Sequence, residues 1–506
     1  MIFQQNKANS GIITNLPSTD VAWATGRNVR FVPGAVYKKF GSTSLATRSL
    51  PLRGLFTFKG FDDVFRSVAC FDTKIESGTN NFTAIQTITP ASAPTSGISD
   101  VWQFAMVGGQ PIFTNGINTP WQWTNFANVL SPLTNAPICK AIASHKGRVI
   151  AGYISESGFT YPARVRWSNI HAPTDWTLDL KGMSGYKDLI PISASIDAID
   201  GIKSITNDGD TLIVFCGRNI WFGAFNGGIT TYNWTALDQG LGLVAPRAFV
   251  KTTYGQIYFM SQEDFYILGK GAQPIGFPIR NAVFPNLNKA AINTAFAYYR
   301  QSTKEVVFCF ATGTNTVPDT EVVYQEETKA WSIGDCNYTV ASLNYDSSNF
   351  QWSTLPYGSW TSITDGRWDE IGDTGVIPYQ TTGNSSGIIC KQDDGYNNYD
   401  STPISAYIET GDFRNDDYHN IVINTVELAV KPQTPKNALM VKVGARRNLS
   451  DPIQWSLPQP FYIGTGERVK FHHAGKYVRL RFESNVIDSP WTLEGFHVDV
   501  RVGAKR

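Results

Sequence analysis

The chain has 506 residues, of which 42% are apolar, 13% aromatic and only 17% charged, and its formal net charge is +1. The length predicts two or three folded units, and the composition excludes a disordered chain, a coiled coil and a collagen-like chain. Few charges, many aromatic residues, 44 Gly and 26 Pro instead favour an all-β fold, because aromatic side chains suit a pleated surface and Gly and Pro form turns.

The charges are unevenly distributed along the chain. Residues 1–60 contain eight Lys or Arg and one acidic residue, and residues 431–506 contain thirteen Lys or Arg and six acidic residues. The middle of the chain is therefore acidic. A DNA-reading domain would instead carry a basic patch on its body.

The cysteines and the chain start bear on the compartment. Six scattered cysteines without a C-x-x-C motif indicate buried free thiols of a protein made in a reducing compartment. The first ten residues turn polar at once, so we expect no secretory leader. The chain also lacks the run of about 18 apolar residues that a membrane-spanning helix needs, so we expect no such helix.

The first 50 residues contain strand-like pieces at 29–32 and 35–37, set between Gly and Pro. Residues 1–50 are therefore expected to form an N-terminal arm. This arm either docks on the C-terminal domain or contributes to the repeats that follow.

Residues 51–400 repeat one unit, in which an apolar strand, a polar turn and a second apolar strand follow each other. The turns fall near residues 60, 109, 147, 209, 255 and 304. Their spacing is close to the roughly 40–50 residues of a four-stranded propeller blade. We therefore predict a β-propeller of six or seven blades, with a pair of β-sandwiches as the alternative. One short helix is expected over residues 286–298.

Residues 401–506 change pattern and alternate cleanly between apolar and polar residues. Six such strands in about 100 residues predict a separate C-terminal β-sandwich. They lie at 405–410, 421–430, 439–443, 468–471, 477–482 and 496–502.

Catalytic and metal-binding motifs are missing from the sequence. The chain contains no H-E-x-x-H, no G-x-S-x-G and no G-x-x-x-x-G-K-[ST]. His472 and His473 are neighbours on a predicted strand and should point to opposite faces, which prevents joint metal ligation. We expect no enzyme activity, no catalytic residue, no metal and no cofactor.

Three segments resemble a known family. The most specific is Arg164-Val-Arg-Trp-Ser-Asn-Ile-His-Ala-Pro-Thr-Asp-Trp176, which resembles a phrase in tail proteins of short-tailed bacteriophages. The segment Gly26-Arg-Asn-Val-Arg-Phe-Val-Pro-Gly-Ala-Val36 is similar to the start of those proteins. The closing stretch, Gly475-Lys-Tyr-Val-Arg-Leu-Arg-Phe-Glu-Ser484 followed by Trp491-Thr-Leu-Glu-Gly-Phe-His-Val-Asp-Val-Arg501, is similar to their end. The sequence thus resembles the tail nozzle family, known as tail tubular protein B or the packaged-DNA stabilisation protein.

The resemblance implies a structural virion protein that carries a propeller. It implies a homohexameric tube below the portal and adaptor that contacts other tail proteins, retains packaged double-stranded DNA and conducts it non-specifically during genome ejection. It also implies synthesis in the host cytoplasm without secretion, followed by residence in the virion tail. It does not identify the residues that line the DNA channel.

Two groups of residues follow as site candidates. The family motif gives residues that either pack within a blade or form an interface: Arg164, Arg166, Trp167, Pro173, Asp175 and Trp176. The basic chain ends give candidates for docking against neighbouring tail subunits: Lys38, Lys39, Arg446 and Arg447.

Two other functions stay open. The propeller could be a carbohydrate-binding or hydrolysing module, a virion adhesin, with Trp121, Trp123, Trp352 and Trp360 stacked on sugars. The same residues also suit the core of a blade. A cellular scaffold that binds peptides is a third class, but regular WD or kelch blades are missing from the sequence.

Overall fold

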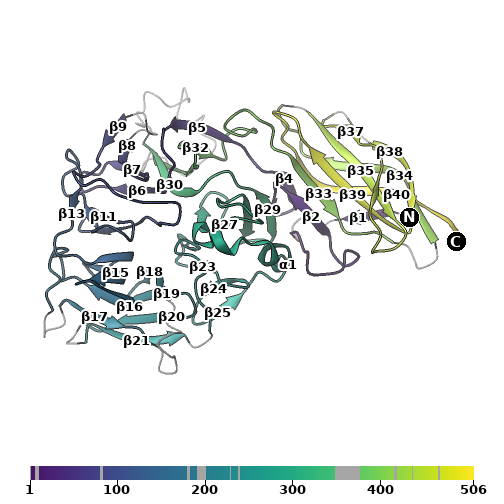
Figure 1. Ribbon diagram of the computed structural model, residues 1–506. Helices are drawn as coiled ribbons and strands as arrows, with labels where there is room; N and C mark the ends of the chain where they lie inside the picture. Colours follow the sequence, from purple (N-terminus) through teal and green to yellow (C-terminus); the bar gives the residue numbers. More distant parts are fainter. Residues whose placement is uncertain are drawn as a thin grey trace, which may run out of the picture.

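The computed structural model describes residues 2–5, 11–79, 82, 84–178, 183–190, 201–227, 230–237, 240–347, 376–414, 419–435, 437–464, 466 and 468–505. Within these ranges the chain forms nine antiparallel β-sheets, seven of four strands and two of six, and very little helix (Figure 1). The prediction of an all-β chain is confirmed. The many four-stranded sheets are consistent with propeller-like and sandwich folds.

The seven four-stranded sheets, called sheets 1 to 7, follow one another along the chain. Sheet 1 contains β6 (Gly54–Lys59), β7 (Phe65–Cys70), β8 (Ile75–Thr79) and β9 (Ala84–Thr87). Sheet 2 contains β10 (Gln103–Val107), β11 (Gln110–Thr114), β12 (Trp121–Gln122) and β13 (Ser131–Pro132). Sheet 3 contains β14 (Ile138–His145), β15 (Arg148–Glu156), β16 (Phe159–Trp167) and β17 (Gly185–Asp188). Sheet 4 contains β18 (Ile202–Asp208), β19 (Thr211–Cys216), β20 (Ile220–Phe225) and β21 (Tyr232–Leu237).

The remaining three sheets of this kind come from the middle of the chain and from one N-terminal strand. Sheet 5 contains β22 (Phe249–Lys251), β23 (Ile257–Met260), β24 (Phe265–Leu268) and β25 (Ala272–Pro274). Sheet 6 contains β26 (Phe296–Arg300), β27 (Glu305–Phe310), β28 (Thr320–Gln325) and β29 (Trp331–Asp335). Sheet 7 contains β30 (Val340–Ser347), β31 (Val376–Gly383), β32 (Ile388–Gln392) and β5 (Ser42–Thr47).

The repeated polar turns of the sequence have one structural role. Each of the six turns joins the first and second strands of one sheet, in sheets 1 to 6 in order. In sheet 4, for example, Gly209 lies between β18 and β19 with a φ of +58°. Glycine adopts such a conformation without a steric penalty, which suits a tight hairpin.

Neighbouring four-stranded sheets share apolar cores. Each pair contributes buried residues to a common cluster, or residues packed against it: Val68 and Phe113 for sheets 1 and 2, Ile112 and Val149 for 2 and 3, Ile150 and Val214 for 3 and 4, Phe215 and Phe259 for 4 and 5, Phe259 and Phe308 for 5 and 6, Val323 and Ala341 for 6 and 7, and Ile389 and Ala69 for 7 and 1. Because sheet 7 packs against sheet 1, the succession of sheets closes on itself.

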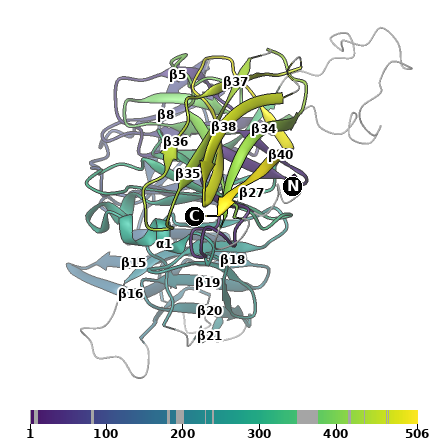
Figure 2. The ribbon, with the colours of Figure 1, turned by 90° about the vertical axis from the view of Figure 1, so that its right-hand side faces the viewer.

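Two six-stranded sheets lie beside sheets 1 to 7 and contain both chain ends (Figure 1). Sheet 8 contains β1 (Ile2–Gln5), β3 (Val29–Val32), β4 (Ala35–Lys38), β34 (His419–Val430), β38 (Arg468–Gly475) and β40 (Thr492–Lys505). Sheet 9 contains β2 (Trp23–Arg27), β33 (Ala406–Thr410), β35 (Ala438–Arg446), β36 (Gln454–Trp455), β37 (Gln459–Tyr462) and β39 (Tyr477–Ser484). The two sheets bury one common apolar core, and Figure 2 views β34, β35, β38 and β40 from their outer side.

The first 50 residues divide between the two groups of sheets. Strands β1 and β4 pair with β40, and β2 pairs with β33, so this part is built into sheets 8 and 9. Strand β5 instead pairs with β32 and is the outer strand of sheet 7. The chain therefore passes from one group of sheets to the other between β4 and β5, before the boundary expected at residue 50.

The helix expected over residues 286–298 is not formed. The region contains a four-residue helix α1 (Arg280–Val283) and two 3₁₀ helices, η3 (Phe284–Asn286) and η4 (Lys289–Thr294), before β26 begins. Pro285 lies in the first turn of η3, and the Asn288 side chain caps η4 by accepting a hydrogen bond from the Ala290 amide. Residues 296–298 belong to β26, which pairs with β27 as the first strand of sheet 6.

Candidate functional site

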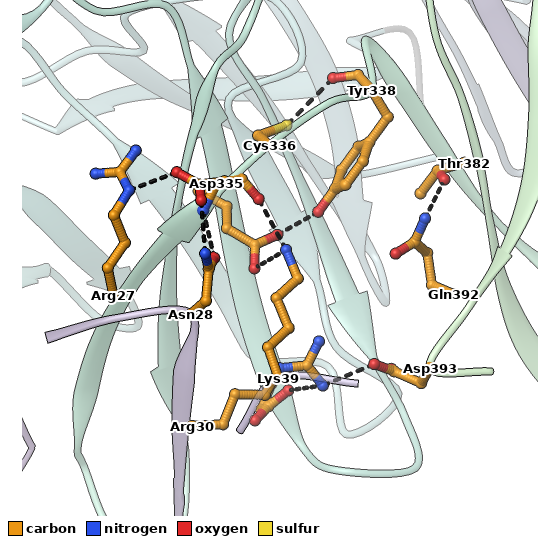
Figure 3. A network of polar contacts seen from close by, with 12 residues as sticks. Arg27, Asn28, Arg30, Lys39, Asp335, Cys336, Tyr338, Thr382, Gln392 and Asp393 are labelled. Atoms are coloured by element: carbon orange, nitrogen blue, oxygen red, sulfur yellow. Dashed lines mark hydrogen bonds and ion pairs between the residues drawn. The ribbon is translucent and has the colours of Figure 1, made fainter. Parts of the chain in front are cut away.

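A buried group of charged side chains joins the N-terminal strands to sheets 6 and 7 (Figure 3). It is called the junction network and consists of Arg30 on β3, Lys39 after β4, Arg300 on β26, Glu305 on β27, Glu321 on β28 and Asp393 after β32. The side chains of Arg30, Arg300, Glu305 and Glu321 are each only 1% exposed. Three cations thus meet three carboxylates inside the protein.

Each cation of the junction network contacts carboxylates from other strands. Arg30 Nη1 lies 2.8 Å from Asp393 Oδ1 and 3.5 Å from Glu305 Oε2. Lys39 Nζ lies 2.7 Å from Glu321 Oε1. Arg300 reaches Glu305 at 3.3 Å, Asp393 at 3.5 Å and Glu321 at 3.7 Å. The charges therefore neutralise one another across three separate parts of the fold.

Tyrosine hydroxyls add hydrogen bonds to the network. Arg300 Nη2 donates to Tyr298 Oη at 2.7 Å, and the Tyr298 and Tyr338 hydroxyls lie 2.8 Å apart. The Tyr338 hydroxyl also donates to Glu321. Glu321 therefore accepts hydrogen bonds from a hydroxyl and an ammonium, which satisfies a buried carboxylate.

The pKa values follow from this pairing. Burial by itself would raise the pKa of the Glu321 carboxyl, but Lys39 and Arg300 outweigh burial and lower the pKa to about 2. Burial likewise opposes ionisation of Asp393, and Arg30 and Arg300 lower its pKa. Both carboxyls therefore stay charged at neutral pH, and the network remains balanced.

Backbone contacts extend the junction along β29. Asn28 donates its backbone N–H to the Ile333 carbonyl at 3.0 Å, and its side-chain oxygen accepts from the Asp335 amide at 2.7 Å. Lys39 Nζ donates to the Asp335 carbonyl at 2.8 Å (Figure 3). The arrangement holds sheets 6 and 8 in one geometry. The junction network thus serves to pair charges between strands of different sheets.

The family-motif residues come together in sheet 3. Arg164 forms two contacts with Asp188, at 2.7 and 2.9 Å, and its guanidinium lies over the rings of Tyr161 and Tyr186. Hydrogen bonding to Asp188 raises the pKa of Arg164 above its usual range. Arg166, two residues on, pairs with Glu156 on the neighbouring strand β15.

The rest of the motif forms the turn after β16. Arg166 Nη2 donates to the Trp176 carbonyl at 2.7 Å, and the Trp176 indole donates to the Pro173 carbonyl at 2.8 Å. Asn169 donates to the Asp175 carboxylate at 3.0 Å. Trp167 and Trp176 are buried in two different apolar clusters. The motif thus packs sheet 3, and an interface role for these residues stays a prediction.

The docking candidates differ in exposure. Lys38 is buried, and burial lowers its pKa to about 8, while Lys39 belongs to the junction network. Arg446 pairs with Asp412 and donates to the Ser18 hydroxyl at 3.0 Å. These three charges are paired or enclosed within the chain, which argues against docking through them. Arg447 is exposed, and docking through it stays a prediction.

Sequence reasoning missed most of the junction network. Arg30, Arg300, Glu305 and Glu321 were not candidates, because most pairs of the network join residues that lie far apart along the chain, such as Lys39 with Glu321. A signal was nevertheless present. Arg30 and Glu321 each lie next to runs of apolar residues, where a charge has to find a buried partner.

Two of the four tryptophans proposed as sugar platforms are buried. Trp121 and Trp123 are 3% and 0% exposed and pack in the core shared by sheets 1 and 2, so neither can stack on a sugar. Trp352 and Trp360 lie outside the described residues.

All six cysteines are buried, and none of them forms a disulfide. Among the described residues, no three His, Cys, Asp or Glu side chains gather in a way that could hold a metal ion. In the same part of the chain, no helix has the length and apolar character needed to cross a membrane.

Comparisons with known proteins identify no family. No family model and no curated protein matches the sequence. Among solved structures, the extracellular domain of a putative one-component system from B. thetaiotaomicron has 10% identity and a TM-score of 0.41 over 90% of this chain and 60% of its own. The AfRom2 CNH domain has 10% identity and a TM-score of 0.36 over 69% and 98% of the two chains. A chain of the nidogen/laminin complex has 10% identity and a TM-score of 0.29 over 44% and 76%. Likenesses this weak carry no argument about function.

Proposed function

We propose that sheets 1 to 7 are the blades of a seven-bladed β-propeller and that sheets 8 and 9 form a β-sandwich. The support is the shared core at every junction between neighbouring sheets, including that of sheet 7 with sheet 1. Strand β5 supports the same idea, because an N-terminal strand in the last sheet ties the two ends of the ring together.

On this fold we propose a structural virion protein, the tail nozzle of a short-tailed bacteriophage. Six copies would form a tube below the portal and adaptor that retains packaged double-stranded DNA and passes it during genome ejection. The protein would be made in the host cytoplasm, act without turnover or cofactor, and remain in the virion tail. The three sequence segments that resemble this family support the proposal.

The junction network is the observation that supports the structural role. Buried ion pairs lock the β3–β4 segment to sheets 6 and 7, so a load on one group of sheets is passed to the other. A tube that holds pressurised DNA needs subunits that resist such loads. Removing one partner of a buried ion pair is strongly destabilising, so the link is costly to break.

Assembly tests the proposal directly. Purified protein is mixed with a portal–adaptor complex from a short-tailed phage and imaged by negative-stain electron microscopy, with mass photometry of the same sample. We expect a ring of six copies attached to the adaptor. Protein that stays monomeric and unattached at micromolar concentration would contradict the proposal.

A charge reversal tests docking through the basic C-terminal region. Arg447→Glu should weaken attachment to the adaptor because Arg447 is exposed. Arg218→Glu is the matched control, since Arg218 is also exposed but lies in the turn between β19 and β20, on sheet 4. Equal attachment of the two variants would remove Arg447 from the docking surface.

A further inference from the structure

A cavity of about 490 Å³ opens where the first strands of sheets 2, 3 and 4 begin. Its size lies within the roughly 300–1,000 Å³ of small-molecule sites. Five polar residues that line it carry the argument: Asp100 before β10, Lys140 on β14, Tyr153 on β15, Lys203 on β18 and Asn293 on η4.

Two β-bulges direct side chains toward this cavity. The pairing of β15 with β16 shifts between Gly152 and Ile154, and Tyr153, the residue between them, has a φ of +55°. The pairing of β18 with β19 shifts between Ile202 and Ser204, which brackets Lys203. Bulges re-aim side chains and are frequent next to functional sites. A bulky residue at positive φ is strained, and such strain gathers at sites of function.

Glycines keep the space open around these side chains. A Cβ at Gly201 would lie 2.5 Å from the Tyr153 ring, so any side chain there would displace Tyr153. A Cβ at Gly116 would lie 3.0 Å from Lys140 Cγ, and Gly116 also has a φ of +79°. Two positions next to the cavity thus accept only glycine without a local shift.

The bulge at Lys203 is held by a neighbouring sheet. The Gln103 side chain donates to the Lys203 carbonyl at 3.3 Å, and its oxygen accepts from the Ile142 amide at 3.3 Å. One glutamine therefore links sheets 2, 3 and 4 beside the cavity. This contact fixes the backbone that carries Lys203.

Three charged side chains that line the cavity are available to contact a ligand. Lys140 Nζ lies 4.2 Å from the centre of the Tyr153 ring, and neither Lys140 nor Lys203 forms an ion pair with any carboxylate of the described residues. Asp100 uses one oxygen to accept from the Gly97 amide at 2.7 Å, which leaves the other oxygen available. Two ammonium groups and one carboxylate give the lining a net charge of about +1, which suits an anionic ligand.

We propose that this cavity binds an acidic sugar. Its carboxylate or phosphate lies between the ammonium groups of Lys140 and Lys203, and its hydroxyls pair with Asp100 and Asn293. The half-buried Tyr153 ring, which lines the cavity, packs against the sugar ring, as aromatic side chains do with apolar sugar faces. This site is distinct from the tryptophans considered above, and the inference does not depend on the proposed role in a phage tail.

Isothermal titration calorimetry with four probes tests the proposal. Galacturonate and glucose 6-phosphate carry the two kinds of anion, and galactose and glucose are their neutral counterparts. We expect at least one anionic sugar to bind with a Kd below about 1 mM and at least tenfold more tightly than its neutral counterpart. The stronger of the two anions then identifies the group that the lysines recognise. Absence of binding by both anions at 10 mM, or equal binding of an anion and its counterpart, overturns the proposal.

Variants locate the binding in the cavity. Lys203→Gln and Lys140→Gln should each weaken binding of the anionic sugar at least about tenfold, since each removes one charged hydrogen bond. Lys270→Gln is the matched control, because Lys270 is exposed in the turn between β24 and β25 and should leave binding unchanged. Lys140 is exposed, so its variant reports even if Lys203→Gln disturbs the bulge. Unchanged affinity in Lys140→Gln, with a native circular dichroism spectrum, would contradict the assignment.

Discussion

Replacing Glu321 by Gln should destabilise the protein strongly. Gln keeps the size of the side chain but removes one of the three negative charges of the junction network. Lys39 and Arg300 would then remain buried with too few carboxylates to neutralise them. The loss should exceed that of any exposed ion pair, because a buried unpaired charge cannot be solvated by water.

The size of the effect can be estimated in two ways. Lowering the pKa of Glu321 from 4.5 to about 2 corresponds to about 3 kcal/mol in favour of its charged form. Removing one partner of a buried ion pair costs about 3–5 kcal/mol in other proteins. We therefore expect the free energy of unfolding to fall by about 3 kcal/mol.

Urea unfolding followed by tryptophan fluorescence measures this loss. Glu327→Gln is the control, because Glu327 pairs with Lys304 at 2.7 Å on the surface and should contribute less than about 1 kcal/mol. The double variant Lys39→Met with Glu321→Gln should be more stable than Glu321→Gln alone, since it removes the uncompensated ammonium. If Glu321→Gln and Glu327→Gln unfold at the same urea concentration, the reasoning about the junction network is refuted.

Three further predictions follow from other features. The stabilisation from Glu321 is fully present above pH 4.5 and should be lost as the pH falls towards 2, because the folded state holds the lower pKa; urea midpoints that stay constant between pH 5 and 3 in the wild type would contradict this. Gly41→Ala should cost several kcal/mol, since its Cβ would lie 2.0 Å from the Asn397 carbonyl oxygen where the chain passes from β4 to β5, whereas Gly269→Ala meets no atom closer than 3.9 Å and should fold normally by circular dichroism. None of the six buried thiols should react with Ellman's reagent in the native protein, and burial raises the pKa of Cys139 to about 12, while all six should react in denaturant; rapid labelling of the native protein would show that a thiol is accessible.

Much of the strand pattern could be predicted from local sequence. The six polar turns between residues 60 and 304 are hairpin turns of six consecutive sheets, and all six strands expected beyond residue 400 are formed. Turn residues and apolar alternation are properties of neighbouring residues, so they can be recognised without knowing the fold. The exception is the short helix expected at 286–298. Residues 289–294 form a 3₁₀ helix, and residues 296–298 belong to the first strand of sheet 6. Strand pairing there overrides the local helix propensity.

Strand partners and charge partners depended on the tertiary structure. Nothing in the sequence near β5 indicates that it pairs with β32, more than 300 residues later, or that β4 pairs with β40. For the same reason Lys39, expected on a docking surface, is the partner of Glu321. Local periodicity decides on which face of its strand a side chain lies. Which distant residue it meets there is decided only when the sheets pack and the buried charges have to neutralise one another.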